Sequence, residues 1–335
     1  MRSWAGRKSA RLMNVAIIGA GLSGLSCADA LAATGHRSAL FDKGRGPGGR
    51  MATRRAGTVA GEASFDHGAQ YFTARHPEFL KQVGDWSARG AASPWPEAGA
   101  DAWVGVPAMN SVLKDMATRH DVEFNFNAKG LVRDGRKWLI VGDHESRGHF
   151  DAVVIAAPAE QSASILALHD FEMARAALLA RSQPCWAAMF TFASPVPAAG
   201  NILRDRGAIT WAARNNAKPG RAGLECWVVH ANAAWSTAHL EESPGTVEQL
   251  LRDHFEAAIA APLPAILYSV AHRWRYALSS GTGRGALWNE DIRLGVCGDW
   301  LLGPRVECAW LSGQELGARI AEAEIASMPL LGLRG

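Results

Sequence analysis

The sequence predicts an α/β fold in which a domain of parallel strands and helices is interrupted by a mainly antiparallel β domain. Three observations lead to this prediction: residues 14–41 have a strand–helix–strand pattern, residues 185–275 are mostly β-like, and residues 293–327 return to a strand followed by a helix. Strands that alternate with helices indicate a parallel sheet. Because this pattern occurs at both ends of a β-rich middle, we expect one discontinuous domain that holds an inserted second domain.

The strand–helix–strand unit at 14–41 is the best defined. Residues 14–18 are an apolar, β-branched run, which is typical of a buried parallel strand. Residues 22–34 have apolar or small side chains at helical spacing, and Gly35 is suited to end that helix. Residues 37–41 give the second strand of the unit.

Beyond residue 41, the period of the apolar residues decides the element type. Helical spacing predicts helices, alternation or short β-branched runs predict strands, and an Asp-Gly pair between two such runs predicts a hairpin turn. We therefore expect helices at 76–90, 108–119, 245–260 and 307–327, a turn at Asp134-Gly135, and strands at 122–126, 138–141, 151–157, 186–192, 224–230, 266–271 and 293–297.

The chain length of 335 residues suits about two domains. We expect a tail at 1–12, a discontinuous Rossmann-like domain at 13–75, 105–160 and 290–330, and a β-rich domain at 76–104 and 161–289.

The composition excludes several classes of protein. The net charge is only +3 and no basic block is interleaved with aromatic residues, so no nucleic-acid partner is expected. No uncharged run is both long enough and free enough of proline to cross a membrane. The 5 cysteines form no C-x-x-C pair, which argues against a zinc ribbon or a disulfide scaffold and fits a reducing cytoplasm.

The first motif is a glycine pattern at the junction of the first strand and helix. Gly19-Ala20-Gly21-Leu22-Ser23-Gly24 is a G-x-G-x-x-G sequence, whose glycines allow a tight turn, close approach of a pyrophosphate and helix–strand packing. The helix N-terminus offers N–H groups to the phosphates. Asp42 ends the second strand, where an acid accepts hydrogen bonds from ribose hydroxyls. The motif predicts a dinucleotide site, and a purely structural glycine turn is the alternative.

A second glycine-rich segment, residues 44–53, follows directly. A unit that binds only a nicotinamide dinucleotide does not need it. Paired glycines let the backbone pass close to a second part of a longer cofactor, and Arg50 can bind phosphate through two hydrogen bonds. A surface loop is the alternative.

A third segment, residues 65–72, is suited to border a planar ring. Gly68 and Ala69 are small residues between polar and aromatic ones, so the backbone can lie against a flat ligand. His67 is a candidate base, although a hydrogen-bonded structural histidine is the commoner case.

The fourth motif lies at the last strand. Gly298-Asp299-Trp300 ends it, so that Asp299 is placed to bind a sugar-alcohol hydroxyl. The helix that starts near Glu307 can stabilise negative charge on a reduced ring. The alternative is that Glu307 is an ordinary acid of a helix N-terminus.

These four motifs resemble those of the flavin-dependent amine-oxidase superfamily and, within it, of the bacterial renalases. The resemblance extends over residues 14–325. The segments that support it are Phe41-Asp42-Lys43, Gly48-Gly49-Arg50-Met51, Asp66-x-Gly68-Ala69-Gln70-Tyr71-Phe72-Thr73-Ala74-Arg75, Trp103-Val104-Gly105, Trp211-x-Ala213-Arg214-Asn215, Ala271-His272-Arg273-Trp274-x-Tyr276-Ala277, Cys297-Gly298-Asp299-Trp300 and Arg305-Val306-Glu307.

The resemblance implies a Rossmann-like FAD-binding domain and an oxidase. Its substrates would be the 2- and 6-dihydro isomers of NAD(P)H, which become NAD(P)+ while O2 is reduced to H2O2. Hydride would pass to N5 of the flavin, so no acid or base from the protein is expected to be catalytic. The expected partners are thus a dinucleotide and O2.

The resemblance also implies the residues that touch FAD. They are Gly19, Gly21, Leu22, Ser23, Gly24, Asp42, Lys43, Gly49, Arg50, Gly68, Ala69, Gln70, Ala128, Gly298, Asp299, Val306 and Glu307. Many amine oxidases attach the flavin to a cysteine, but the comparable stretch 279–286 has none. We therefore expect the FAD to be bound non-covalently. No metal is expected, because the sequence contains no metal-ligand cluster.

The candidate substrate residues are Tyr71, Phe72, Trp103, Trp211 and Arg214. Aromatic rings can stack on a nicotinamide ring, and Arg214 can face a ribose or a phosphate. Ordinary core packing is the alternative for each tryptophan.

Two alternative functions remain open from the sequence. An amine oxidase would use the same fold with an aromatic cage around a neutral amine. A redox-silent dinucleotide-binding protein is the other alternative, although flavin motifs at both ends of the chain argue against it.

Overall fold

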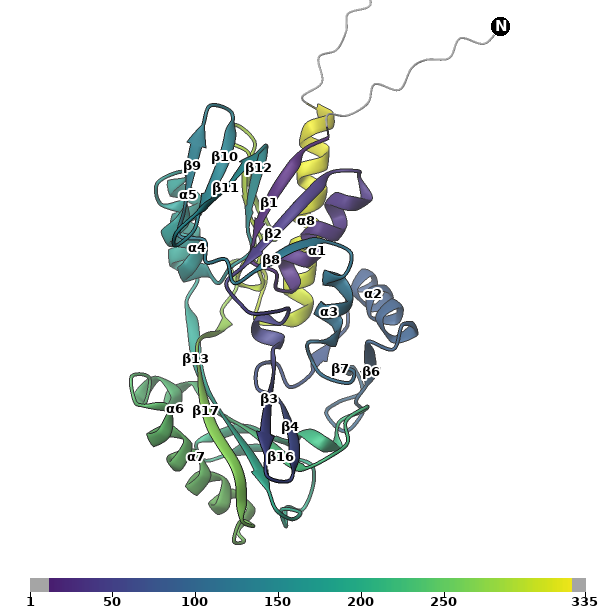
Figure 1. Cartoon of the computed structure of the whole chain (residues 1–335), viewed down its shortest axis with the longest axis vertical. Helices are drawn as coiled ribbons and strands as arrows, with labels where there is room; N and C mark the ends of the chain where they lie inside the picture. Colours follow the sequence, from purple (N-terminus) through teal and green to yellow (C-terminus); the bar gives the residue numbers. More distant parts are fainter. Residues whose placement is uncertain (1–11, 327–335) are drawn as a thin grey trace, which may run out of the picture.

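The computed structural model describes residues 12–326, so nearly all of the expected tail at 1–12, and the positions after 326, lie outside the described residues. The described chain forms a parallel-sheet region and an antiparallel-sheet region, with smaller elements between them (Figure 1).

A six-stranded sheet organises the first region. Its strand order is β18-β19-β12-β1-β2-β8, and every neighbouring pair is parallel except β18 with β19. The strands are β1 (Asn14–Ile18), β2 (Arg37–Asp42), β8 (Asp121–Phe124), β12 (Ala152–Ile155), β18 (Leu287–Asn289) and β19 (Leu294–Val296).

Alternating side chains of β1 enter two different cores, as the two-residue period of a strand requires. Val15 and Ile17 pack with α1 (Leu22–Ala33) and α8 (Val306–Ala326). Ala16 and Ile18 pack on the other face. That face is covered by β9 (Gly130–Asp134), β10 (Lys137–Val141), β11 (Ser146–Phe150), α4 (Ala159–Leu166) and α5 (Phe171–Leu179).

The second region is a five-stranded antiparallel sheet with the order β14-β15-β16-β13-β17. One face is covered by α7, whose buried Val247, Leu251 and Phe255 pack against it. The elements are β13 (Ser182–Phe192), β14 (Ile202–Arg206), β15 (Ile209–Arg214), β16 (Glu225–Ala231), β17 (Ile266–Ser279), α6 (Ala233–Ala238) and α7 (Pro244–Ile259).

Smaller elements lie beside these two regions. The hairpin of β3 (Thr53–Thr58) and β4 (Gly61–Asp66) extends towards the antiparallel sheet (Figure 1). The other elements are η1 (Gly49–Met51), β5 (Phe72–Thr73), α2 (Pro77–Ala88), β6 (Ala92–Pro94), β7 (Ala102–Gly105), α3 (Ser111–Ala117), η2 (Asn215–Ala217) and η3 (Asp299–Leu301).

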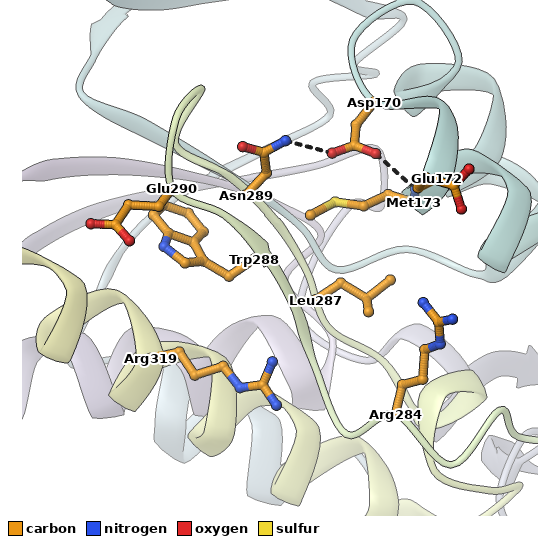
Figure 2. Close-up of a pocket in the computed structure, with 9 residues that line it drawn as sticks. All are labelled: Asp170, Glu172, Met173, Arg284, Leu287, Trp288, Asn289, Glu290 and Arg319. Carbon is orange, nitrogen blue, oxygen red and sulfur yellow. Dashed lines mark hydrogen bonds between the residues drawn. The ribbon is translucent and has the colours of Figure 1, made fainter.

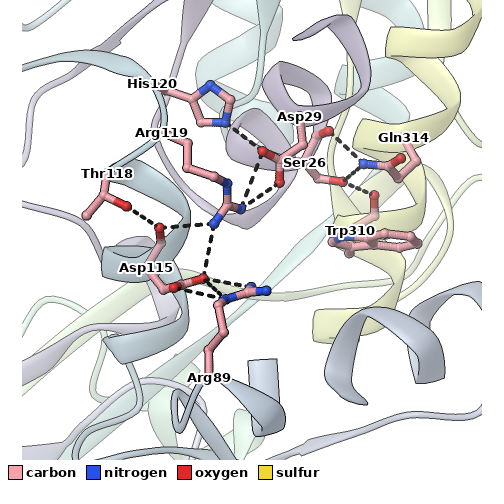
Figure 3. A network of polar contacts seen from close by, with 9 residues as sticks. All are labelled: Ser26, Asp29, Arg89, Asp115, Thr118, Arg119, His120, Trp310 and Gln314. Carbon is pink, nitrogen blue, oxygen red and sulfur yellow. Dashed lines mark hydrogen bonds and ion pairs between the residues drawn. The ribbon is translucent and has the colours of Figure 1, made fainter. Parts of the chain in front are cut away.

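Polar contacts fix α1 between α3 and α8 (Figure 3). Arg119, just after α3, donates to Asp29 of α1 at 3.1 Å and to Asp115 of α3 at 3.1 Å. Three residues earlier in α1, the Ser26 hydroxyl donates to the Trp310 carbonyl of α8 at 2.7 Å. The middle of α1 is thereby tied to both neighbouring helices.

The predicted fold class is confirmed, and the expected domain boundaries differ from the packing. We expected 161–289 to belong to the β-rich domain, yet α5 packs on the parallel sheet and β18 joins it. The reason is that the small apolar face of α5, with Ala174 and Ala177, is buried in the core beneath that sheet. Within residues 12–326, no helix is long and apolar enough to span a bilayer.

Candidate functional site

The predicted dinucleotide motif has the geometry that its glycines suggest. Gly19 has a φ of +108°, which favours glycine, and a Cβ on Gly24 would lie 2.0 Å from the Gly19 carbonyl oxygen. A Cβ on Gly21 would meet nothing within 4 Å. Gly21 is also the N-cap of α1, and no side chain caps that helix. The first turn of α1 therefore opens onto free space beside Gly21.

Asp42 connects the two glycine-rich segments. One carboxylate oxygen accepts a hydrogen bond from the Ala20 amide at 2.7 Å, and the other accepts from the Gly44 amide at 2.7 Å. The Gly44 carbonyl in turn accepts from the Asn125 amide at 2.9 Å, which brings the segment that leads to Ala128 to the same place. The carboxyl ends of β1, β2 and β8 thus meet here, where open α/β sheets bind their ligands.

Arg50 links the beginning of the chain to its end. Its guanidinium donates two hydrogen bonds to the Asp299 carboxylate, at 2.8 and 2.5 Å. The Arg50 carbonyl accepts from the Ala69 amide at 2.8 Å, and a Cβ on Gly68 would lie 2.0 Å from that same carbonyl. The second, third and fourth motifs therefore share one seam, which we call the motif seam: residues 49–51, 66–70 and 298–307.

The other predicted cofactor residues lie in or next to α1, β2, η1 and α8. Glu307 is 2% exposed and accepts hydrogen bonds from the amides of Arg75 and His76, at 2.7 and 2.6 Å, so it fixes the segment that enters α2. The Gly298 amide donates to Ser312 of α8 at 2.9 Å. The remaining ones are Leu22 and Ser23 in the first turn of α1, Lys43 after β2, Gly49 in η1 and Val306 at the start of α8.

A buried polar cluster joins Asp66 and Gln70 of the motif seam to two residues that the sequence analysis missed, Lys218 and Arg221. The Asp66 carboxylate accepts from the Lys218 ammonium at 3.2 Å and from the Arg221 guanidinium at 2.6 Å. Lys218 also donates to Gln70 at 2.9 Å. The Lys218 and Asp66 side chains are fully buried. We call Asp66, Gln70, Lys218 and Arg221 the buried cluster.

Burial and charge shift the protonation of this cluster. Burial lowers the pKa of Lys218 to about 8, even though Asp66 opposes that change. Burial alone raises the pKa of Asp66, but the Lys218 and Arg221 cations hold it below its ordinary value. Two cations thus share a single carboxylate in a site that water does not reach.

Two buried histidines near the motif seam, His67 and His230, stay neutral at neutral pH. Burial, with smaller contributions from His272 and Arg54, lowers the pKa of His67 to about 3. Burial lowers the pKa of His230 to about 4. His67 packs against the rings of His272 and Trp274, at centroid distances of 5.0 and 5.2 Å. It is therefore a poorly basic, packed side chain.

An aromatic group follows the motif seam directly. Tyr71 lies 5.0 Å from the Trp211 ring and 6.3 Å from the Trp95 ring, between centroids, and the two indoles are 6.3 Å apart. Lys218 lies 5.4 Å from the centre of the Trp95 ring. Tyr71 and Trp211 were candidates from the sequence, whereas Trp95 was not.

The other substrate candidates are not brought into this group. Phe72 is 2% exposed and packs in the core against Phe79 and Trp86. Trp103 is half-buried and pairs with Phe72 across β5 and β7.

Arg214 lies on the opposite face of β15 from Trp211. Trp211 joins the core next to the parallel-sheet region, while the Arg214 guanidinium donates to the Val196 carbonyl at 2.9 Å and pairs with Glu225 at 3.2 Å. It also lies 5.3 Å from the centre of the Trp227 ring, in the core under α7. The structure therefore does not bring Arg214 and Trp211 together.

A separate cavity of about 390 Å³ lies at the outer edge of the parallel sheet (Figure 2). It is lined by α5, β18 and their neighbours, including Met173, Trp288 and Arg319. None of its lining residues belongs to the motif seam or to the buried cluster.

The residues present fit a long dinucleotide such as FAD. The space beside Gly21, which a side chain would fill, is suited to a pyrophosphate at a helix N-terminus. Asp42 is placed for ribose hydroxyls, and Arg50 and Asp299 lie further along the same seam.

Comparisons with known proteins agree with this geometry. Residues 17–83 match the model of an NAD(P)-binding Rossmann-like domain, and residues 96–314 match that of flavin containing amine oxidoreductases.

Solved structures with similar folds include a putative protoporphyrinogen oxidase from Exiguobacterium sp. 255-15, with 12% identity, a TM-score of 0.69 and coverage of 92% of this chain and 98% of that one. Cyclohexylamine oxidase from Brevibacterium oxydans IH-35A has 13% identity, a TM-score of 0.65 and coverage of 93% and 99%. A redesigned putrescine oxidase has 13% identity, a TM-score of 0.63 and coverage of 93% and 99%.

The family match covers well over half of the chain and the dinucleotide motif precedes it, so the protein belongs to the flavin containing amine oxidoreductase family and uses FAD as its cofactor.

Proposed function

We propose that the protein is an oxidase of the 2- and 6-dihydro isomers of NAD(P)H, as in the bacterial renalases that its sequence resembles. The overall reaction converts the neutral dihydronicotinamide, O2 and one proton into NAD(P)+ and H2O2. When bound, FAD supplies the hydride acceptor and returns the two electrons to O2.

The observation that best supports this proposal is that three groups at or beside the motif seam, His67, His230 and Asp66, are unsuited to act as a base. Burial lowers the pKa of His67 to about 3 and that of His230 to about 4. The Asp66 carboxylate is occupied by Lys218 and Arg221. Loss of hydride from a dihydropyridine restores an aromatic ring without removal of a proton, so it needs none of these groups as a base.

The protein's own residues would bind FAD and orient the substrate. The N-terminus of α1 beside Gly21 would hold the pyrophosphate of FAD, and Asp42 would bind its ribose. Arg50 and Asp299 would bind the part of FAD that leads towards the flavin ring. Tyr71, Trp95 and Trp211 would form the aromatic side of the substrate site, where flat rings favour a planar nicotinamide. Orientation of this kind accounts for a large part of catalysis when the chemistry belongs to a cofactor.

An amine oxidase remains the second candidate. The fold neighbours whose names give an amine, cyclohexylamine and putrescine, favour it, and an aromatic group next to a flavin is compatible with it.

Anaerobic mixing of the purified holoenzyme with 6-dihydroNAD, NADH or benzylamine distinguishes these functions. We expect rapid loss of flavin absorbance with the isomer only. Loss with benzylamine and not with the isomer would assign the protein to the amine oxidases. A protein purified with flavin that no electron donor reduces would support the redox-silent alternative.

A further inference from the structure

The parallel sheet ends in an edge that no described strand covers. β18 (Leu287–Asn289) is the last strand of that sheet, and within residues 12–326 it pairs only with β19. Its three residues are half-buried and line the cavity of about 390 Å³, so this edge is open to solvent. An open edge offers unpaired N–H and C=O groups to another strand, and proteins either protect such an edge or use it for association.

Two unpaired charges flank the centre of this edge. Arg284 and Glu290 are exposed, line the same cavity and lie three residues before and three residues after Leu287. Figure 2 shows the two charged side chains at opposite ends of the cavity, with Leu287 between them. Neither side chain has an ion pair or a hydrogen bond with any residue of the described chain, 12–326. Opposite charges at equal distances from one residue are complementary to a second, antiparallel copy of the same edge.

An exposed apolar surface lies next to this edge. In the part of the chain that the structure describes, nine large apolar side chains are exposed, and four of them lie in or beside α5. We call these four the α5 patch: Leu168, Phe171, Leu178 and Leu179, with exposed fractions of 89, 71, 69 and 67%. The Asp170 carboxylate, which caps α5, accepts a hydrogen bond from Asn289 of β18 at 2.8 Å. The patch and the edge therefore form one continuous face, and apolar surface gathered in this way marks an interaction site.

We infer that this face binds a second copy of the chain. β18 pairs antiparallel with its own copy around a two-fold axis at Leu287, and the two α5 patches pack against each other. Arg284 of each protomer then lies opposite the partner's Glu290, so the interface contains the same ion pair twice. A two-fold axis perpendicular to the sheet keeps both copies of α5 on the same side of the joined sheets, which is why the patches meet.

The charges of this face favour a second copy over a lipid surface. Arg284 is balanced by Glu290, and on α5 Arg175 is balanced by Glu172, to which it donates at 3.0 Å. A face without net charge has no electrostatic attraction for an anionic membrane. Charges of both signs, placed symmetrically about one residue, are what an isologous interface requires, because each surface must complement itself.

The size of the face also matches a dimer. β18 has only three residues, so backbone pairing alone would bury too little surface for a stable complex. Stable interfaces bury about 800 Å² on each partner and have an apolar centre. The α5 patch supplies the apolar surface that the short edge strand lacks.

The mass of the purified holoenzyme in solution is the first test. We expect sedimentation equilibrium to give twice the mass of one chain. A monomer at every concentration measured would overturn the inference, and so would a monomer that floats with vesicles of anionic phospholipid.

Charge reversal tests the edge. Arg284→Glu places two glutamates opposite each other at both ends of the edge, so the dissociation constant of the dimer should rise at least about tenfold. Glu290→Arg should have the same effect with two arginines. The double variant Arg284→Glu/Glu290→Arg restores both ion pairs and should return to the wild-type constant.

A mixture of the two single variants provides a second rescue. In a heterodimer of Arg284→Glu with Glu290→Arg, each glutamate lies opposite an arginine, so heterodimers should form where neither variant dimerises well alone. Both positions are exposed, so flavin content and melting temperature of the monomer should be unchanged. Wild-type dimerisation of both single variants would show that the edge is not at the interface and would overturn the inference.

A substitution in α5 tests the patch. Leu178 is 69% exposed in the last turn of α5, where a cation is favourable for the helix, so Leu178→Lys should fold normally. We expect it to raise the dissociation constant of the dimer at least about tenfold. The matched control is Val59→Lys between β3 and β4, where valine is 95% exposed, and the constant should not change. A wild-type constant for Leu178→Lys would contradict the inference.

Discussion

Glycines a few residues apart at the start of α1 have opposite surroundings. A Cβ on Gly24 would lie 2.0 Å from the Gly19 carbonyl oxygen, whereas a Cβ on Gly21 would meet nothing within 4 Å. The first is required by the packing of the helix on the strand. The second leaves open space at the N-terminus of α1, where the pyrophosphate of FAD would fit.

We therefore expect Gly21→Val to abolish retention of FAD without unfolding the apoprotein. Gly21 has an ordinary φ of −76°, so valine adds little backbone strain. Flavin content after gel filtration and the melting temperature of the apoprotein are the measurements. The control is Gly24→Val, which should destabilise the fold by about 3 kcal/mol because backbone must move. A Gly21→Val protein that remains yellow and fully loaded would refute the assignment of the phosphate site.

Strand geometry separates the two substrate candidates of β15. Trp211 and Arg214 point to opposite faces, and the Arg214 guanidinium already binds Glu225 and the Val196 carbonyl. We expect Arg214→Gln to lower the free energy of unfolding by about 1–3 kcal/mol and to leave the dissociation constant of the substrate unchanged.

For Trp211→Phe we expect the opposite result: the substrate binds more weakly, while the flavin content is preserved. Urea unfolding and anaerobic titration with the substrate measure the two quantities. Weaker substrate binding in Arg214→Gln would restore the role that the sequence suggested for this arginine.

At the scale of elements, the position of the cofactor site depends on how closely α1 and α8 approach. A Cβ on Gly313 would lie 2.2 Å from the Ser23 carbonyl oxygen, and one on Gly317 would lie 2.5 Å from the Ala30 Cβ. The two helices cross at these glycines, which hold the phosphate-binding turn against the helix that begins at Val306.

We expect Gly313→Ala to destabilise the protein by about 1–3 kcal/mol, because the added methyl group forces the helices apart. FAD should also bind more weakly, since the N-terminus of α1 moves. Gly84→Ala in α2 is the matched control: its Cβ meets nothing within 4 Å, so it should be neutral or stabilising by about 0.5–1 kcal/mol. Urea unfolding and FAD titration of the apoprotein check both. Equal stability of the two variants would contradict this account of the helix crossing.

At the scale of the whole molecule, the FAD site is assembled from distant parts of the chain. Arg50 and Asp299 are 249 residues apart in sequence and bind each other directly. The Asp42 region joins β1, β2 and the segment after β8. Because FAD would contact all of these segments, its binding should couple strongly to global folding.

We expect removal of FAD to lower the melting temperature, and added FAD to raise it with the logarithm of the free FAD concentration. At 100 times the dissociation constant the gain is about 2.7 kcal/mol. FMN lacks the half of the cofactor that reaches Gly21 and Asp42, so it should give a much smaller shift. Calorimetry of the apoprotein with each flavin measures this. Equal shifts would show that the dinucleotide motif does not hold the adenine half.

The sequence by itself determined the parts of this protein that depend on neighbouring residues. The β1–α1–β2 unit and the glycines around Gly21 were predictable because strand period, helix period and turn chemistry are local properties. The opposite orientations of Trp211 and Arg214 follow from β15, a strand that the sequence analysis did not predict, because residues an odd number apart in a strand face opposite sides.

Only the tertiary structure decided which distant side chains meet. Lys218 follows a short helical turn in the antiparallel region, and nothing local to it indicates a buried ion pair with Asp66. Trp95 was not among the substrate candidates, yet it packs against both Tyr71 and Trp211. Charge balance is a property of the assembled interior, because it depends on which groups are excluded from water together.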